Sequence, residues 1–303
     1  MRDLVRRLAA ALSLLALCGC SRTSTPSAVE AAPQAASQPA SPTSTPAVGF
    51  DRNNYPGDAA MTAMRSSFAF TGYWVTNPPG AHSNTWLGKR EFLKQHGWGF
   101  LVLANGRLDA EILRAQKRGT PPASLARSDA AIAVAAARHE GFPPHTILFL
   151  DQEEGGALLD EQAAYLLGWT EAVATSEFRP GVYASGQPVP DDPGTTITTI
   201  DDIRKRVQTQ HLHQIAIFDA QDACPPAPGC TLATKPLDAS GELVLSAGGN
   251  LIAWQYSQSP RRPSITRSCG ATYAANGNCY APGFSTVFLD LDEASSADPS
   301  HGR

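Results

Sequence analysis

Eight short apolar runs recur along the chain, and helical stretches separate most of them. The runs cover residues 48–51, 68–75, 99–105, 146–151, 180–185, 214–220, 251–256 and 286–291. The helical stretches cover residues 58–67, 85–95, 109–118, 128–139, 158–178 and 200–211. Strands that alternate with helices predict a parallel sheet, and eight such strands in about 245 residues predict an α/β fold, the (β/α)8 TIM-like barrel. We expect its last two units to be irregular. A doubly wound open sheet is the alternative, although no phosphate-binding glycine loop follows the first run.

The first 20 residues have the pattern of an export signal. Arg2, Arg6 and Arg7 precede a short apolar segment, which is too short to span a bilayer. The apolar segment runs to Leu17, and the sequence LCGCS at residues 17–21 resembles the lipobox of bacterial lipoproteins with Cys20 as the acylated residue. We therefore expect residues 1–20 to be a lipoprotein signal peptide. The alternative is an ordinary signal peptide that is cleaved nearby.

The next segment, residues 21–47, consists almost wholly of Ser, Thr, Pro, Ala and Gln. Such a composition predicts a disordered tether, because it buries too little apolar area to offset the entropy lost on ordering. We expect an exported protein held at the cell envelope by a membrane-inserted lipid, in the outer membrane or periplasm where the host has two membranes. The barrel would then span residues 48–294, with a flexible tail at 295–303.

The charge of the chain argues against one class of partner. Its formal net charge is −4, and charged residues make up 17% of it. Nucleic-acid binding requires a clustered basic surface, so we expect no nucleic-acid partner.

Four cysteines lie beyond the signal, at positions 224, 230, 269 and 279. An even number of cysteines in an exported protein indicates disulfides. The close spacings favour the pairs Cys224–Cys230 and Cys269–Cys279. A zinc site is the alternative, but the C-x₂-C spacing is absent and no histidine lies near, so we expect no metal.

The most informative motif is TILFLDQEEGG at residues 146–156. An apolar strand ends there in acids, and Asp151 and Glu153 share one face because strand side chains alternate. Their Cα atoms would lie roughly 6–7 Å apart, close enough for the two charges to couple. Glycosidases need such a pair, although an acidic cap on a strand end is the simpler alternative. Glu154 points to the opposite face, so we expect its replacement by Gln to be close to neutral.

Acidic, amide and aromatic residues gather on the other strands of the predicted barrel, most of them at the strand ends. Barrel enzymes work at the carboxyl ends of their strands, and flat rings with carboxylates suit a carbohydrate. The expected substrate-binding residues are Asp51, Tyr73, Tyr183, Trp254, Gln255, Tyr256, Asp290 and Asp292.

The order of these motifs resembles the glycoside hydrolase family 25 lysozymes, secreted muramidases with an irregular β/α barrel. More specifically, it is similar to the bacterial glycoside-hydrolase-like group filed as domain-of-unknown-function family 1906. The motifs are GFD at 49–51, DQE at 151–153, GVY at 181–183, WQYS at 254–257 and LDLD at 289–292. The resemblance implies that Glu153 is the proton donor, that Asp151 is its partner acid, and that Asp51 and Asp290 line the cleft. The chain departs from the family at Asp292, where the lysozymes favour Asn.

The expected function is therefore hydrolysis of a cell-wall glycan, with peptidoglycan as the leading substrate, by carboxylate acid–base chemistry without a cofactor. Glu153 would protonate the glycosidic oxygen while Asp151 stays ionised. The alternative is a catalytically silent glycan-binding or envelope-scaffolding lipoprotein that keeps the cleft.

Overall fold

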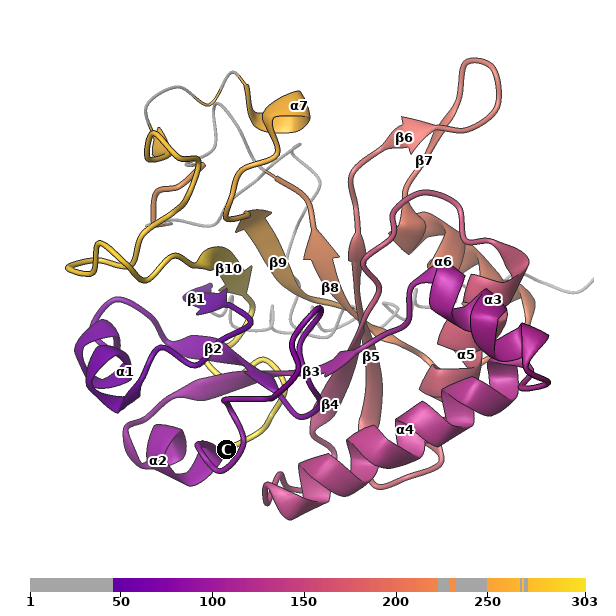
Figure 1. Ribbon diagram of the computed structural model, residues 1–303, viewed down its shortest axis with the longest axis horizontal. Helices are drawn as coiled ribbons and strands as arrows, with labels where there is room; N and C mark the ends of the chain where they lie inside the picture. The colour runs from indigo at the N-terminus through magenta and orange to yellow at the C-terminus, as the bar shows by residue number, and fades with distance from the viewer. Residues whose placement is uncertain (1–45, 223–228, 233–249, 268, 270–271) are drawn as a thin grey trace, which may run out of the picture. The chain divides into compact units, whose positions relative to one another are not determined.

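Eight strands close into a barrel in the computed structural model of the protein, which describes residues 46–222, 229–232, 250–267, 269 and 272–303. The prediction of an α/β TIM-like barrel is confirmed (Figure 1). The barrel strands are β1 (Ala47–Asp51), β2 (Phe70–Trp74), β3 (Gly99–Asn105), β4 (Ile147–Asp151), β5 (Arg179–Ser185), β8 (Ala216–Ala220), β9 (Leu251–Ser257) and β10 (Asp290–Ala294). Each of the eight apolar runs corresponds to one of them.

The direction of the last strand differs from the prediction. β1 to β5, β8 and β9 are parallel, whereas β10 runs antiparallel to both of its neighbours, β1 and β9. In this register Asp290 lies opposite Asp51, and Asp292 lies opposite Gly49. Asp290 is therefore at the same barrel end as the carboxyl ends of the parallel strands, and Asp292 lies deeper.

Helices cover the outside of the barrel along its first five strands. They are α1 (Asp58–Met64), α2 (Arg90–Gln95), α3 (Asp109–Lys117), α4 (Pro122–His139) and α5 (Asp160–Ala174), followed by α6 (Thr199–Thr209). α4 begins six residues earlier than the sequence pattern predicts, with Pro122 at its first position, where a missing N–H costs nothing. α4 and α5 approach closely at Gly168, where a β-carbon would lie 3.2 Å from the Cβ of Ala126.

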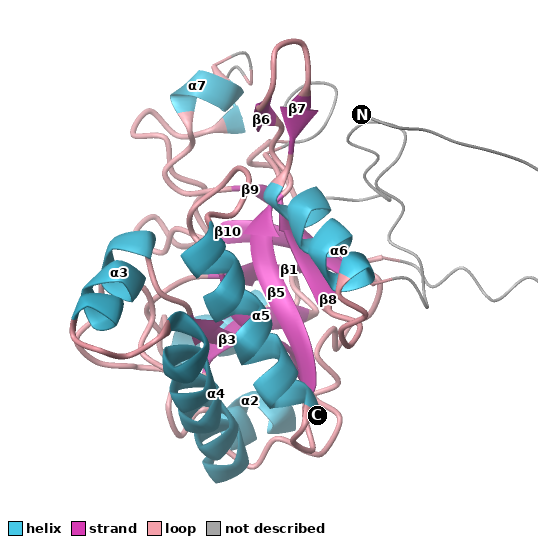
Figure 2. Ribbon diagram, turned by 90° about the vertical axis from the view of Figure 1, so that its right-hand side faces the viewer, coloured by secondary structure: helices cyan, strands magenta, loops and turns pink. Residues whose placement is uncertain are grey.

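The connection between β9 and β10 is irregular, as expected, and carries the single turn α7 (Pro263–Thr266) in place of a long helix. The connection from β5 to α6 contains the short antiparallel hairpin of β6 (Val189–Pro190) and β7 (Thr196–Ile197), which the sequence does not predict. Figure 2 shows the hairpin and α7 at one end of the barrel and the C-terminus at the other. The hairpin and α7 thus border the barrel end that carries Asp51 and Asp290.

The core is apolar on both sides of the strands. Ile147, Leu148, Phe149 and Leu150 of β4 are all fully buried, because one side of the strand faces the barrel interior and the other faces the helices. A strand buried on both sides shows no alternation of polar and apolar residues, so the sequence does not reveal which side chains point inward.

Residues 297–303 close the end of the barrel opposite Asp51, and we call this end the barrel floor. The Phe100 N–H donates to Asp298 Oδ1 at 3.0 Å, and the Val102 N–H donates to the buried Ser300 Oγ at 2.9 Å. The buried Arg90 guanidinium donates twice to the Gly302 carbonyl, at 2.7 and 3.2 Å. These contacts attach the segment to the barrel, although the sequence analysis expects a flexible tail at 295–303.

Among the described residues, no helix has both the length and the apolar character needed to cross a membrane. The expected signal peptide, Cys20 and nearly all of the tether lie outside the described residues, as does Cys224.

Candidate active site

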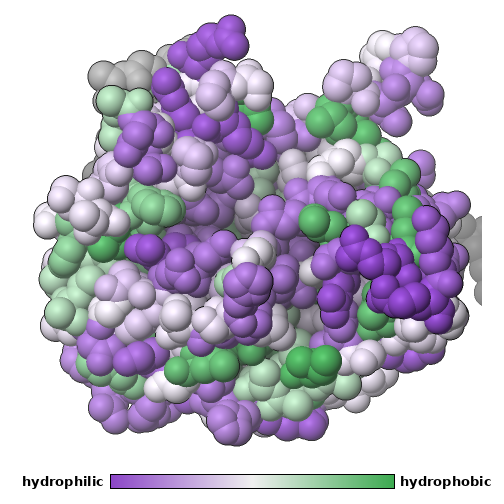
Figure 3. Space-filling model, in the orientation of Figure 1, coloured by the Kyte–Doolittle hydropathy of each residue, from purple (hydrophilic) through white to green (hydrophobic). Residues whose placement is uncertain are grey.

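A pocket of about 240 Å³ opens at the barrel end opposite the floor, and we call it the mouth pocket. Its lining residues are Asp51, Asn53, Trp74, Leu103, Asp151, Glu153, Tyr183, Phe218, Gln255, Gln258, Ser259, Pro260 and Asp290. Figure 3 shows this end of the surface hollowed between the β6–β7 hairpin and the segment that carries α7, with many hydrophilic side chains along it. The strand ends thus bring together most of the polar residues that the sequence singles out.

Two glycines let the backbone close around the acids. On β2, a side chain at Gly72 would lie 2.5 Å from the Asp51 Cβ, so only glycine leaves room for this carboxyl group. After β3, a side chain at Gly106 would lie 2.2 Å from the Asp151 carbonyl oxygen, which accepts the Gly106 N–H at 3.1 Å. The loop after β3 therefore lies directly against the end of β4.

Asp151 and Glu153 lie within hydrogen-bonding reach of each other but differ in burial. Asp151 is only 4% exposed, whereas Glu153 is exposed at the pocket rim. Burial raises the pKa of Asp151 well above its usual value, and the charges of Glu153 and Asp51 raise it further. Burial also raises the pKa of Glu153, but the hydrogen bond to Asp151 opposes this rise.

In the free site these shifts favour a proton on Asp151 and a charge on Glu153, with Asp151 donating to Glu153. The sequence predicts the opposite order, with Glu153 protonated and Asp151 ionised. The difference has a physical cause, because the more deeply buried of two coupled acids loses more hydration on ionising and therefore keeps the proton.

Asp51 belongs to a chain of hydrogen bonds across the mouth pocket. Gln255 Nε2 donates to Asp51 Oδ2 at 2.7 Å, the Tyr183 hydroxyl donates to Gln255 Oε1 at 2.8 Å, and Gln258 Nε2 donates to the Tyr183 hydroxyl at 3.2 Å. Burial raises the pKa of Asp51 to about 6, although the hydrogen bond from Gln255 opposes the shift. The structure thus brings together at one pocket three of the residues that the sequence predicts to bind substrate, Asp51, Tyr183 and Gln255.

The two acids of β10 occupy different depths. Asp290 lines the pocket and accepts the Ser259 N–H at 2.5 Å, while burial raises its pKa well above the usual value. Asp292 is fully buried beneath Asp51 and does not line the pocket. The antiparallel direction of β10 explains this placement, since the chain enters the barrel at Asp290 and continues inward to Asp292.

Three aromatic residues that the sequence predicts as substrate-binding lie outside the mouth pocket. The Tyr73 hydroxyl donates to Glu140 on the helix side of β2. Trp254 Nε1 donates to the Gln221 carbonyl at 2.7 Å, and the Tyr256 hydroxyl donates to the Thr231 carbonyl at 3.1 Å. All three side chains are buried, and their polar atoms are bonded within the fold.

Trp74 takes the place that the sequence analysis gives to Tyr73. It follows Tyr73 on β2 and therefore points to the other face, where it lines the pocket with its Nε1 donating to the Arg52 carbonyl at 3.2 Å. The signal in the sequence is the glycine at position 72, since Gly72 and Trp74 share the face that must leave room for Asp51. Gln258, Ser259 and Pro260 were also missed, because they follow a strand without any motif of their own.

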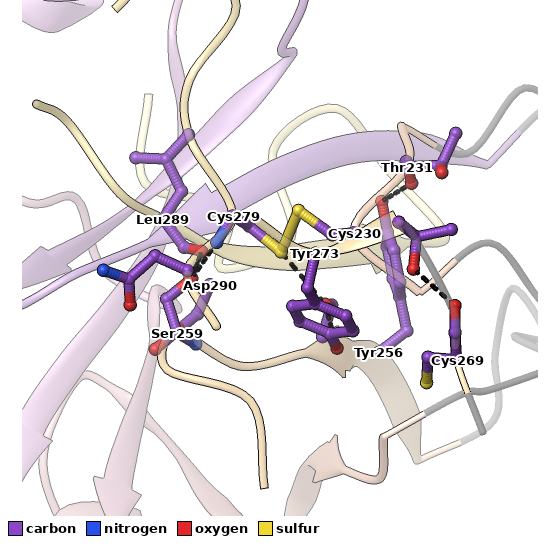
Figure 4. Close-up of a disulfide and its surroundings, with 12 residues drawn as sticks. Cys230, Thr231, Tyr256, Ser259, Cys269, Tyr273, Cys279, Leu289 and Asp290 are labelled. Carbon is purple, nitrogen blue, oxygen red and sulfur yellow. Dashed lines mark hydrogen bonds between the residues drawn. A yellow bond between two sulfur atoms is a disulfide. The ribbon is translucent and has the colours of Figure 1, made fainter. Parts of the chain in front are cut away.

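A disulfide holds the rim of the mouth pocket (Figure 4). It joins Cys230 to Cys279, so the predicted pairs Cys224–Cys230 and Cys269–Cys279 are both wrong. Cys269 is disulfide-bonded as well. The Cys279 N–H donates to Ser259 Oγ at 2.8 Å, which connects the disulfide to the residue that binds Asp290. The close spacing of the cysteines along the chain gave the wrong pairs, because loop packing brings together cysteines 49 positions apart.

Glu154 holds the loop after β4 in place. Its Oε2 accepts the Asp109 N–H at the start of α3 and the Gln162 Nε2–H of α5, both at 2.7 Å. It therefore fixes the segment that carries Glu153 to two helices, and its replacement by Gln is not the neutral control that strand alternation suggests.

No group of three or more histidine, cysteine or acidic side chains in the described part of the chain is arranged to hold a metal ion. A second hollow of about 450 Å³ borders Asp151 and Glu153 on the side of Arg107 and Leu108. The acid pair thus lies between two cavities, with room for a ligand on either side. A further hollow of about 470 Å³ beside α4 contains neither of these acids.

Solved structures resemble this fold at low sequence identity. An uncharacterized B. stearothermophilus protein is 17% identical with a TM-score of 0.50, and the alignment covers 82% of this chain and 95% of that one. The Mycobacterium tuberculosis Tat-secreted protein Rv2525c, in complex with L-tartrate, is 12% identical with a TM-score of 0.45, covering 83% and 95%. The catalytic domain of endolysin ply40 from bacteriophage P40 of Listeria monocytogenes is 14% identical with a TM-score of 0.40, covering 82% and 93%. No curated protein matches the chain.

A family model agrees with the architecture. The model described as "Rv2525c-like, glycoside hydrolase-like domain" matches residues 66–223, just over half of the chain. The match contains Trp74, Asp151, Glu153 and Tyr183, whereas Asp51 and the acids of β10 lie outside it. The chain belongs to the Rv2525c-like, glycoside hydrolase-like domain family.

Proposed function

We propose that the mouth pocket hydrolyses glycosidic bonds in a cell-envelope glycan, with peptidoglycan as the substrate. The observation that carries this proposal is the pair Asp151 and Glu153. One of these acids is buried, the other is exposed, and together they lie between two cavities. Asp151 Oδ1 has no hydrogen-bond partner among the described residues, although it is buried and belongs to the pocket lining. A buried polar atom without a partner is costly, so it favours a role in binding or catalysis.

The pair can supply the acid that glycoside hydrolysis needs. The raised pKa values favour one proton shared between the two carboxyl groups. Glu153 is the exposed member, so it is the group that can reach the glycosidic oxygen of a bound glycan. As positive charge develops on the sugar, ionisation of the nearby Asp151 becomes favourable, and the shared proton passes through Glu153 to the leaving oxygen. This order reconciles a protonated Asp151 in the free site with Glu153 as the proton donor.

The rest of the lining suits a sugar. Trp74 and Tyr183 provide ring surfaces, while Asp51, Gln255 and Gln258 provide hydrogen-bonding groups for hydroxyls. Positively charged side chains are absent among the described residues of the mouth-pocket lining, so a neutral glycan segment fits better than a phosphate or carboxylate group.

The second candidate is a glycan-binding protein without turnover. The observation in its favour is the strong burial of Asp151, which could hold the proton too tightly for transfer. Incubation of the purified protein with isolated sacculi decides between the two. New reducing ends, with a bell-shaped pH dependence, support hydrolysis. Retention of the protein on sacculi without new reducing ends supports the binding protein.

We also propose that the protein is exported and anchored at the envelope by a lipid on Cys20. The support is the sequence alone, where Cys20 ends an apolar segment that follows three arginines. Cys20→Ala should move the protein from the membrane fraction to the soluble exported fraction. A variant that still sediments with membranes after a salt wash would contradict the anchor.

A further inference from the structure

Asp292 is a fully buried carboxyl group at the centre of the barrel. It lies on β10 opposite Gly49 of β1 and Gln255 of β9. Neither of its carboxyl oxygens has a hydrogen-bond donor among the residues that the structure describes. The group within its reach is another carboxyl, that of Asp51.

An ionised Asp292 would be difficult to sustain in this position. A buried carboxylate without donors loses its hydration and gains nothing in return, and the neighbouring negative charge of Asp51 adds repulsion. A neutral Asp292 avoids both costs, because its O–H can donate to Asp51. We propose that Asp292 is a protonated acid in the folded protein and that it positions and stabilises the ionised Asp51 of the mouth pocket.

The Asp51 carboxylate would then accept two hydrogen bonds, one from Gln255 Nε2 at 2.7 Å and one from the Asp292 O–H. The Tyr183 hydroxyl fixes the Gln255 amide, so the arrangement leaves Asp51 with defined oxygens facing the pocket. Asp292 acts here through Asp51 and is a positioning residue.

The surroundings determine how the pair responds to pH. Asp51 from β1 and Asp290 from β10 act on Asp292, and both raise its pKa after burial, which is the largest cause. The neighbouring β9 presents Gln255, which does not titrate. Across the barrel, the nearby Glu153 acts on Asp51, and Asp51 in turn raises the pKa values of Asp151 and Tyr183.

The first test concerns stability and does not depend on the proposed function. An unfolded aspartate has a pKa of about 3.9, so above that pH unfolding releases the proton that folded Asp292 keeps. The wild-type protein therefore loses stability as pH rises towards the raised pKa of Asp292. Relative to Asp292→Asn, the unfolding equilibrium constant of the wild type should grow about tenfold for each pH unit. Urea unfolding at several pH values between about 5 and 7 measures this ratio.

Asp292→Leu is a second variant for the same measurement. It also removes the titrating group, and an apolar side chain of similar size is tolerated where a buried acid is not ionised. The ratio should also grow with pH for this variant, but less steeply above about pH 6, where an Asp51 that has lost its donor keeps its proton longer than in the wild type. The test therefore survives if one variant fails to fold. A ratio that stays constant with pH for the folded variants would overturn the proposal.

The second test concerns the pocket and rests on the proposed function. Asp292→Asn keeps an N–H donor for Asp51, whereas Asp292→Leu removes the donor. Loss of the donor raises the pKa of Asp51 above its value of about 6. The acidic limb of the pH profile for glycan cleavage, or of glycan binding if there is no turnover, should therefore move to higher pH in Asp292→Leu but not in Asp292→Asn.

Equal shifts in both variants would overturn the positioning role. Absence of any glycan effect in the wild type would contradict the proposed function and leave the stability result to decide the protonation of Asp292.

Discussion

The two ends of the barrel differ in how their buried acids and hydroxyl groups are bonded. At the floor, Ser300 accepts the Val102 N–H with its hydroxyl and the Ile147 N–H with its carbonyl, at 2.9 and 2.8 Å. At the mouth, the buried Asp151 Oδ1 lacks a partner within the described residues, and directly beneath the mouth both carboxyl oxygens of Asp292 lack one. Native proteins pair most of their buried polar groups, so the unpaired ones need an explanation.

The difference indicates which end is stable and which end is available for chemistry. The floor uses its hydrogen bonds to close the sheet, and it holds no unpaired acid among the described residues. The mouth keeps acids close together at raised pKa values, which costs stability and provides groups that can exchange protons. Substitutions at the mouth should therefore change function more than stability, and substitutions at the floor should do the reverse.

The largest expected effect is at Glu153. Glu153→Gln keeps the size of the side chain but removes the transferable proton, so glycan cleavage should fall about 10²–10⁴-fold. The exposed position of Glu153 predicts that the unfolding midpoint hardly changes. Release of reducing ends from sacculi and urea unfolding measure the two quantities. In the wild type, activity should decline at acid pH as Asp51, with its pKa of about 6, becomes protonated.

The control for this variant is Asp160→Asn. Asp160 is exposed in the first turn of α5, the helix that follows the loop carrying Glu153, and it does not line the mouth pocket. Its replacement by Asn removes one negative charge and leaves the pocket unchanged. It should keep the activity within about twofold, since a surface charge at a helix start contributes little. Equal losses in both variants would mean that the acidic residues act only through their total charge.

The next effect concerns the disulfide at the rim of the mouth pocket. Here the contrast between a functional mouth and a structural floor is weakest, because a bond that stabilises the fold borders the mouth. Replacing both Cys230 and Cys279 by Ser opens a loop of 49 residues' separation, which should cost roughly 4 kcal/mol in unfolding free energy by chain entropy. It should also weaken glycan binding, because the Cys279 backbone holds Ser259. Unreduced peptides should contain Cys230 joined to Cys279. A loss below about 1 kcal/mol would show that the bond contributes little to the fold.

At the floor, Ser300→Ala tests the other side of the comparison. It leaves the Val102 N–H buried without its acceptor, so the unfolding free energy should fall by about 1–3 kcal/mol. Activity on sacculi should not change at temperatures where the protein stays folded. The exposed Ser66→Ala is the control and should have almost no effect. A change in the pH profile of Ser300→Ala would break the separation of the two ends.

The sequence predicts some parts of this fold and misses others. The eight strands follow from their apolar runs, since a strand covered on both faces needs a continuous apolar segment. The direction of β10 does not follow, because the run at 286–291 looks the same in either direction, so the sequence could not show that Asp292 lies deeper than Asp290. Asp151 and Glu153 were found because their motif is local.

Long-range packing limited the rest of the sequence analysis. The connection of Cys230 to Cys279 and the docking of Ser300 on β3 depend on contacts between distant segments, for which short spacings carry no signal. The order of protonation within the acid pair depends on relative burial, which strand alternation does not give.

The smallest expected effect separates the two faces of β2. Tyr73→Phe removes a hydroxyl that donates to Glu140, a carboxylate that still accepts the Gly88 N–H at 2.8 Å. The unfolding free energy should fall by about 1 kcal/mol, the usual contribution of one hydrogen bond. Glycan binding should not change, because the Tyr73 side chain lies on the helix side. Trp74→Ala, one residue further, should weaken binding to sacculi, since its ring lines the mouth pocket. Binding assays on both variants, alongside urea unfolding, measure the contrast. Weaker glycan binding by Tyr73→Phe at unchanged stability would show that Tyr73 contributes to binding. The assignment of the two faces of β2 to binding and to structure would then be wrong.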